Sequence, residues 1–212
     1  MQSDEIAVVL GGDTGLIAPA YRMAKTEPKY ASFLNLLETA DIVFVNLETA
    51  LTDHEYPDST SGANKGDPIL VKDYASMGID IMSIGHKVFD FGNVGLIDSI
   101  KALDEAGIKR VGAGKNPAEA TREEVIEVKG QRIGFMKIGV HPPSFRRYEA
   151  LIVNDAHQKP VLEKPGLALL YLKTIYEIDP DQGSITPRTS VIEEVLQKFI
   201  RRIKGVRKKV DL

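Results

Sequence analysis

The first 140 residues alternate short apolar runs with stretches in which apolar side chains recur every three or four positions. A continuous apolar run is typical of a buried strand, and the wider spacing is typical of an amphipathic helix. The runs expected to form strands are 6–10, 42–45, 79–84, 110–111, 125–128 and 133–138. The stretches expected to form helices are 30–40, 71–77, 96–103 and 118–120. This alternation predicts an α/β fold with a mainly parallel sheet.

Glycine and polar residues mark the ends of these elements. Gly78 and Gly107 follow expected helices and are typical C-terminal stops. The Lys-Gly-Gln sequence at 129–131, between two β-rich runs, predicts a hairpin at one side of the sheet. Residues 53–68 are rich in Asp, Ser, Gly, Asn and Pro, and we expect them to form a loop.

The pattern beyond residue 140 is less regular. We expect an irregular stretch at 141–165, a strand or hairpin arm at 166–178 and a turn-rich connector at 179–187. Thr189 or Ser190 is then expected to cap a helix that runs to about Lys204. We interpret 141–188 as an insertion or connector within a single domain that spans residues 1–212.

Composition excludes several classes of protein. The chain has 212 residues, of which 43% are hydrophobic, so it has enough apolar matter for a core and is not expected to be disordered. It has no cysteine, which excludes disulfide scaffolds, zinc ribbons and cysteine nucleophiles. With 27 Lys and Arg against 30 Asp and Glu, the net charge of −3 gives no general attraction to nucleic acid or anionic lipid.

No targeting segment is expected either. The first apolar run is short and follows the acidic pair Asp4-Glu5, whereas a signal peptide has a basic start and a longer apolar stretch. No run approaches the roughly 20 apolar residues of a membrane helix. The sequence therefore predicts a cytoplasmic chain without a membrane segment.

Three loops follow expected strands, at 11–15, 46–49 and 85–93, and such loops meet at one edge of a parallel sheet. In the first loop, Asp13 follows two glycines. The spacing is not that of a dinucleotide-binding loop, and an acidic residue opposes phosphate but suits a metal ion. The alternative is an Asp-Gly turn in which Asp13 caps a helix.

In the second loop, Asn46 and Glu48 point the same way if the strand alternation continues. Together they offer an amide oxygen and a carboxylate to one ion. The alternative is an N-cap pair for a following helix, which needs no metal.

In the third loop, His86 and Asp90 are four residues apart. His86 can serve as a metal ligand or an acid, and Asp90 can supply the carboxylate that orients it. The alternative is a structural role, which is more common for a lone histidine. His141 follows another expected strand and is expected near the same edge. The remaining two histidines, His54 and His157, are expected at the surface.

Longer segments of the chain resemble the CapA family of capsule or poly-γ-glutamate synthesis proteins, which are related to the calcineurin-like metallophosphoesterases. The resemblance lies in Gly12-Asp13 and in residues 41–52, 78–83, 88–96 and 106–120, with similarity also at 165–168 and 174–179. It implies an α/β fold with a metallophosphoesterase-like two-sheet sandwich flanked by helices, and a metal site at the strand ends.

Two departures from the family pattern stand out. The family has Asn-Asn-His where this chain has Gly85-His86-Lys87, so a lysine occupies the expected imidazole position. Later family motifs, His-Trp-Gly and Gly-His-His-Pro-His, are absent, in keeping with a chain that has no tryptophan. We therefore expect an incomplete domain, either the N-terminal portion of a truncated chain or one half of a split protein.

The resemblance leads to a first hypothesis, a metal-dependent hydrolase acting on a phosphoryl or acyl centre. Its divalent ion (Mn, Zn, Mg or Fe) would be held by Asp13, Asn46, Glu48 and His86, with His86, Asp90 and Asn46 as catalytic residues. A second chain carrying the missing motifs, or another copy, would complete the site.

A second hypothesis is a catalytically degenerate member that acts in binding or assembly. A third is a nucleotide-binding α/β domain that uses the loop at 11–15.

Overall fold

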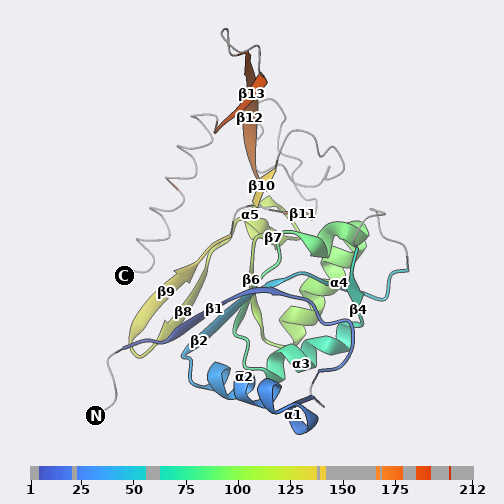
Figure 1. The fold of residues 1–212 in the computed structure, drawn as a ribbon, viewed down its shortest axis with the longest axis vertical. Helices are drawn as coiled ribbons and strands as arrows, with labels where there is room; N and C mark the ends of the chain where they lie inside the picture. Colours follow the sequence, from blue (N-terminus) through green and yellow to red (C-terminus); the bar gives the residue numbers. More distant parts are fainter. Residues whose placement is uncertain are drawn as a thin grey trace.

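The structure is a computed structural model that describes residues 5–20, 23–55, 63–137, 139–141, 166–167, 169–178, 185–191 and 201 (Figure 1). A four-stranded parallel sheet lies at its centre, in the order β1-β2-β5-β6. Its strands are β1 (Val8–Thr14), β2 (Ile42–Leu47), β5 (Ile81–Ser83) and β6 (Lys109–Val111). The helices are α1 (Met23–Thr26), α2 (Pro28–Glu38), α3 (Val71–Ser76), α4 (Gly92–Glu105) and α5 (Pro117–Ala120), with 3-10 turns η1 (Pro68–Leu70) and η2 (Lys87–Phe91). The α/β fold with a parallel sheet is confirmed.

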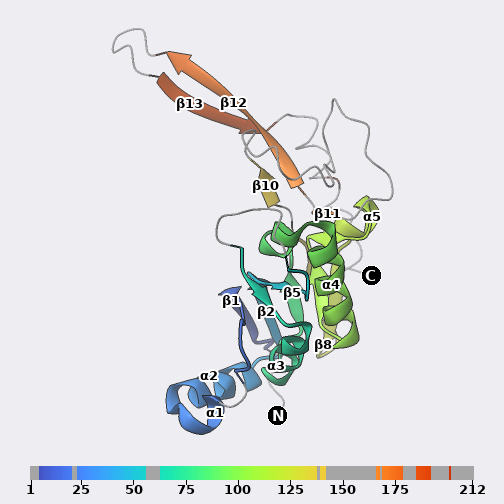
Figure 2. The ribbon, with the colours of Figure 1, turned by 90° about the vertical axis from the view of Figure 1, so that its right-hand side faces the viewer.

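Smaller pairings surround this sheet (Figures 1 and 2). The antiparallel hairpin expected around residues 129–131 joins β8 (Glu124–Val128) to β9 (Gln131–Phe135), with Lys129 and Gly130 both at positive φ in its turn. The remaining short pairs join β3 (Ala50–Leu51) to β4 (Lys65–Gly66), and β7 (Ala113–Gly114) to β11 (Gly166–Leu167). A separate sheet contains β10 (Gly139–His141), β12 (Leu169–Ile178) and β13 (Ile185–Val191).

Strands β2 and β5 of the central sheet are buried on both faces, and alternate residues of these strands contribute to different cores. On β2, Val43 and Val45 face the main core, to which α2, α3 and α4 contribute Leu37, Tyr74 and Leu103. Ile42 faces a smaller core on the opposite side, where the β8–β9 hairpin covers the sheet. The side chains of that second core are Ile42, Ile81, Val111, Phe44, Ile126, Val128, Ile133 and Phe135. The helices thus cover one face and the hairpin covers the other.

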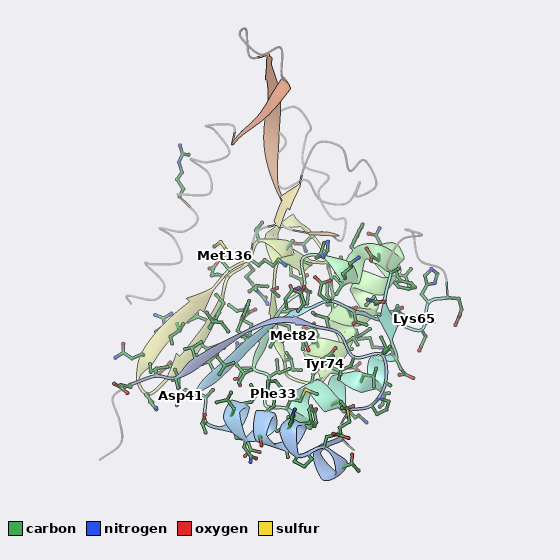
Figure 3. The ribbon with its side chains drawn as sticks, viewed as in Figure 1. Phe33, Asp41, Lys65, Tyr74, Met82 and Met136 are labelled. Carbon is green, nitrogen blue, oxygen red and sulfur yellow. The ribbon has the colours of Figure 1, made fainter. Side chains whose placement is uncertain are left out.

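Two polar contacts connect the sheet to its surroundings (Figure 3). The hydroxyl oxygen of the buried Tyr74 accepts a hydrogen bond from the backbone N–H of Leu16 at 2.6 Å, and burial raises the pKa of Tyr74 to about 12. On the other side, the Asp41 carboxylate accepts hydrogen bonds from the Ala7 N–H and from Lys129 Nζ, each at 2.8 Å. The second contact joins the hairpin turn to the start of β1.

Two expectations for the strands were wrong. The run at 6–10 was expected to be a buried strand that ends at the glycines, but β1 is the edge of its sheet and continues to Thr14. Its outward face is open, with Leu10 73% exposed. Thr189 and Ser190 do not cap a helix: they lie in β13 and pair with β12, because β-branched residues in this stretch favour an extended conformation.

Several expected features fall partly or wholly outside the described residues. They include most of 141–165, the helix predicted up to Lys204 except for Arg201, and His157. In the part of the chain that the structure describes, none of the helices combines the length and apolarity needed to cross a bilayer.

The main core predicts the effect of a truncation in α4. Leu103 is fully buried, so Leu103→Ala is expected to lower the free energy of unfolding by about 2–5 kcal/mol. Val94 lies on the same helix and is 50% exposed, so Val94→Ala should change it by less than about 0.5 kcal/mol. Urea unfolding of both variants measures the difference. Equal losses would contradict the assignment of this face of α4 to the core.

The contact between Asp41 and Lys129 predicts a pH dependence. The Lys129 ammonium, assisted by the Ala7 N–H, holds the pKa of Asp41 below its ordinary value of 3.8. The stability that this carboxylate contributes is therefore fully present above pH 3.8 and is lost as pH falls through the lower pKa of the folded state.

Urea unfolding between pH 2 and 7 tests this dependence. The stability advantage of the wild type over Asp41→Asn should shrink as the pH falls below about 4. Asp53→Asn, at an exposed loop position, is the matched control. An advantage that stays constant across this range would show that the Asp41 charge does not matter.

Candidate functional site

A β-bulge in β1 brings Asp13 to the carboxyl end of the sheet. Leu10 pairs with Phe44 and Asp13 pairs with Asn46, so β1 has one more residue than β2 between these two pairs. Gly11 occupies the bulge, and a Cβ there would lie only 2.8 Å from Val45 Cγ1. If both glycines kept the regular alternation of a strand, Asp13 would face the helices; because the bulge absorbs one of them, Asp13 shares the face of Asn46. The two glycines therefore shape a strand rather than a phosphate-binding turn.

The Asn46 side chain is the centre of a polar network at this edge. Its Nδ2 group donates hydrogen bonds to Asp13 Oδ1 at 2.8 Å and to Glu48 Oε1 at 3.2 Å. The structure thus brings together three of the predicted metal ligands, from β1, from β2 and from the residue that follows β2. One amide group supplies hydrogen-bond donors to both carboxylates and offsets part of their mutual repulsion.

Two further residues belong to this network and were missed by the sequence analysis. Ser83, the last residue of β5, donates its hydroxyl hydrogen to Asn46 Oδ1. Lys137 follows β9, and its Nζ donates to Asn46 Oδ1 at 3.1 Å and to Ser83 Oγ at 3.3 Å. Figure 3 labels Met136, the residue before Lys137, at the end of the hairpin farthest from Asp41. The signal that could have revealed Lys137 is a charged residue within the otherwise apolar run at 133–138.

The environment of Lys137 has opposing effects on its ionisation. Burial lowers the pKa of Lys137, while the negative charges of Glu48 and Asp13 act in the opposite direction, and burial has the larger effect. The ammonium shares the oxygen of Asn46 with Ser83, and the amide nitrogen of the same Asn46 contacts both carboxylates. Positive charge is thus already present at the edge where a metal ion was predicted.

His86 reaches the same network from the loop after β5. Its Nδ1 lies 3.2 Å from Glu48 Oε1, and its side chain is 57% exposed. Because a carboxylate only accepts hydrogen bonds, this contact favours a proton on Nδ1 and leaves Nε2 as the free acceptor. Asp90, predicted to orient His86, forms an ion pair with Lys87 at 3.3 Å. Its orienting role stays a prediction.

The other histidines are described only in part. The backbone of His141 lies in β10, paired with Tyr171, and its side chain is outside the described part. His54 lies after β3, where its N–H donates to Thr52 Oγ1 and its carbonyl accepts from Lys65 Nζ. Asn46 and Glu48 do not begin a helix as the alternative interpretation required, since β3 follows them. Nor does Asp13 cap a helix, because it lies within β1.

The donor chemistry of this network fits a divalent cation in part. Two carboxylates, an amide and an imidazole are ligands that Mn²⁺, Zn²⁺, Mg²⁺ or Fe²⁺ accepts. However, residues 5–137, apart from their undescribed gaps, and the described strands beyond them contain no group of three His, Cys, Asp or Glu side chains placed to hold an ion. An ion would have to replace hydrogen bonds of Asn46, and its remaining ligands would have to come from outside the described residues.

A parallel sheet covered by helices on one face and by a hairpin on the other, with carboxylates at its strand ends, defines a metallophosphoesterase-like α/β protein. Residues 7–212 match the bacterial capsule synthesis protein family PGA_cap. The chain belongs to this family, and the resemblance to CapA proteins is confirmed.

The chain is also similar to individual curated proteins. The uncharacterized proteins y4sH and y4uA of Sinorhizobium fredii are each 26% identical over 161 residues, which cover 73% of this chain and 34% of theirs. A probable polyglutamine synthesis accessory protein of Mycobacterium tuberculosis is 32% identical over 94 residues, covering 43% of this chain and 25% of its own. The matched part of the chain therefore corresponds to about a third of the Sinorhizobium proteins and a quarter of the mycobacterial one.

The network predicts that Asn46 matters for stability even without metal. Asn46→Ala removes the donor to Asp13 and Glu48 and the acceptor of Lys137, and should lower the free energy of unfolding by about 1–3 kcal/mol in the presence of EDTA. Asn93→Ala, at an exposed position of α4, should have little effect. Urea unfolding compares the two. An Asn46→Ala variant as stable as the wild type would argue against the hydrogen-bond network.

Proposed function

We propose that this member of the capsule synthesis family supplies part of a metal-dependent hydrolytic site of the metallophosphoesterase type. The observation that carries the proposal is the convergence of Asp13, Asn46, Glu48 and His86 through hydrogen bonds of 2.8–3.2 Å at one sheet edge. These side chains come from three separate segments, and no helix cap or turn accounts for their meeting.

In this proposal the metal ligands are Asp13, Glu48, the oxygen of Asn46 and a nitrogen of His86. A divalent ion there would activate water and stabilise negative charge at a phosphoryl or acyl centre. Ligands beyond these four would come from a second chain, from another copy, or from residues outside the described part.

The residues of this chain have separate tasks in such a reaction. Glu48 orients the His86 ring through Nδ1, which leaves Nε2 for one of two tasks: to bind the metal ion or, where other ligands hold that ion, to take a proton from water. Asn46 fixes the spacing between the two carboxylates. Lys137 contributes a positive charge beside them, which favours an anionic substrate.

A second candidate is a catalytically degenerate member that acts in binding or assembly. The observation in its favour is the same Lys137, because an ammonium that donates to Asn46 Oδ1 competes with a metal ion for that oxygen. Lys87 also favours this candidate, because it occupies the position at which the family has a histidine. The two candidates differ in whether the purified chain binds a divalent ion through Asp13 and Glu48.

Metal binding is tested by thermal denaturation with Mn²⁺ or Zn²⁺. A site within this chain should stabilise the wild type by about 1.4 kcal/mol when the metal concentration is ten times Kd. Asp13→Ala and Glu48→Ala should each abolish the shift, whereas Glu38→Ala, at an exposed position of α2, should retain it.

Hydrolysis of bis(p-nitrophenyl) phosphate by the same four proteins, with and without metal, distinguishes the candidates. Metal-dependent turnover that falls at least tenfold in Asp13→Ala and Glu48→Ala supports the enzyme. A wild type with neither a metal-dependent shift nor turnover would exclude an active site in this chain alone and favour the binding or assembly role.

A further inference from the structure

Lys137 reaches the polar network along a path that glycines keep open. A Cβ added to Gly85 would lie 2.9 Å from Lys137 Cε, and one added to Gly112 would lie 3.0 Å from Cδ. Gly112 has a φ of +99°, which by itself favours glycine, but Gly85 has no positive φ. A side chain at Gly85 would meet the flexible end of Lys137 and displace it from its present position. Glycine at this point therefore leaves the lysine stem its path to Asn46.

The ammonium also fixes which way the Asn46 amide faces. Lys137 Nζ and the Ser83 hydroxyl both donate to Oδ1, so the NH₂ group of Asn46 is turned toward Asp13 and Glu48. A metal ion between those carboxylates needs the opposite orientation, because it binds an amide through oxygen. Metal binding would thus require the amide to turn and Lys137 to lose its acceptor.

The charges at the site also favour competition between Lys137 and a metal ion. Asp13 and Glu48 supply negative charge, and Lys137 lies close enough for both to act on it electrostatically. An incoming divalent ion would be attracted by the same carboxylates and repelled by the ammonium. Lys87, the other nearby lysine, pairs with Asp90 on η2, and its charge is directed to a different carboxylate.

We propose that Lys137 is a resident cation of this site, which holds the carboxylate pair in a metal-free arrangement and competes with divalent metal for it. The inference rests on the proposed function, since it treats Asp13 and Glu48 as the place where metal binds. It goes further by assigning to one residue the control of how tightly the site binds metal.

Isothermal titration with Mn²⁺ alone, on the full chain, tests the competition. Lys137→Met removes the charge and should bind Mn²⁺ at least tenfold more tightly than the wild type. Lys137→Arg keeps the charge and should bind as the wild type does. Lys101→Met removes a lysine that is 73% exposed on α4 and controls for net charge, so it should leave the affinity unchanged. In the double variant Lys137→Met/Glu48→Gln, the gain should disappear.

The outcomes separate this inference from the proposed function. Equal affinities of wild type and Lys137→Met would overturn the competition and leave the proposed metal site intact. Binding by Lys137→Met alone would support the competition while showing that the native site does not use metal. An absence of binding in both proteins would overturn both ideas. If Lys137→Met does not fold, as judged by circular dichroism, Lys137→Gln takes its place with the same expected gain.

Discussion

Two carboxylates held side by side at the end of a parallel sheet must be neutralised, and the site of this protein is organised around that requirement. Asn46 donates to both Asp13 and Glu48, and Lys137 brings a positive charge within hydrogen-bonding distance of Asn46. An isolated pair of this kind would repel. The network gives each carboxylate a hydrogen-bond donor without metal, and it leaves the imidazole of His86 in contact with Glu48.

The architecture delivers these side chains because parallel strands end at a common edge. Asn46 and Ser83 are paired in register on β2 and β5, and both face the side covered by the β8–β9 hairpin. The hairpin is held there by apolar packing, including the stacked rings of Phe44 and Phe135, whose centroids are 5.5 Å apart. Since Lys137 lies two residues beyond β9, that packing also determines where its ammonium reaches. The position of the Lys137 ammonium in the polar site therefore depends on the packing of the small core.

The sequence predicted the sheet, most helices and the shared edge at which Asp13, Asn46 and Glu48 meet, because these depend on local periodicity and on the rule that parallel strands share an edge. It did not predict the edge position of β1, since an apolar run has the same appearance in an edge strand as in a central one. Lys137 and Ser83 were missed for a related reason: each lies in or beside an apolar run, and only the tertiary register brings them to Asn46. The helix cap expected at Thr189 or Ser190 was wrong because pairing with β12 outweighed a local capping signal.

The bulge at Gly11 divides β1 into two parts that follow different registers. Before the bulge, Val9 pairs with Val43 and Leu10 with Phe44; after it, Asp13 pairs with Asn46. The register between β1 and β2 therefore shifts by one residue at the bulge. A deletion of one glycine would leave Val9 in place against its core and would remove the bulge, while Asp13 would stay opposite Asn46 in a regular register. The bulge therefore absorbs the second glycine without changing the face of the sheet on which Asp13 lies. A change in the number of glycines at this point alters the bend and twist of β1 before it alters the partner of Asp13.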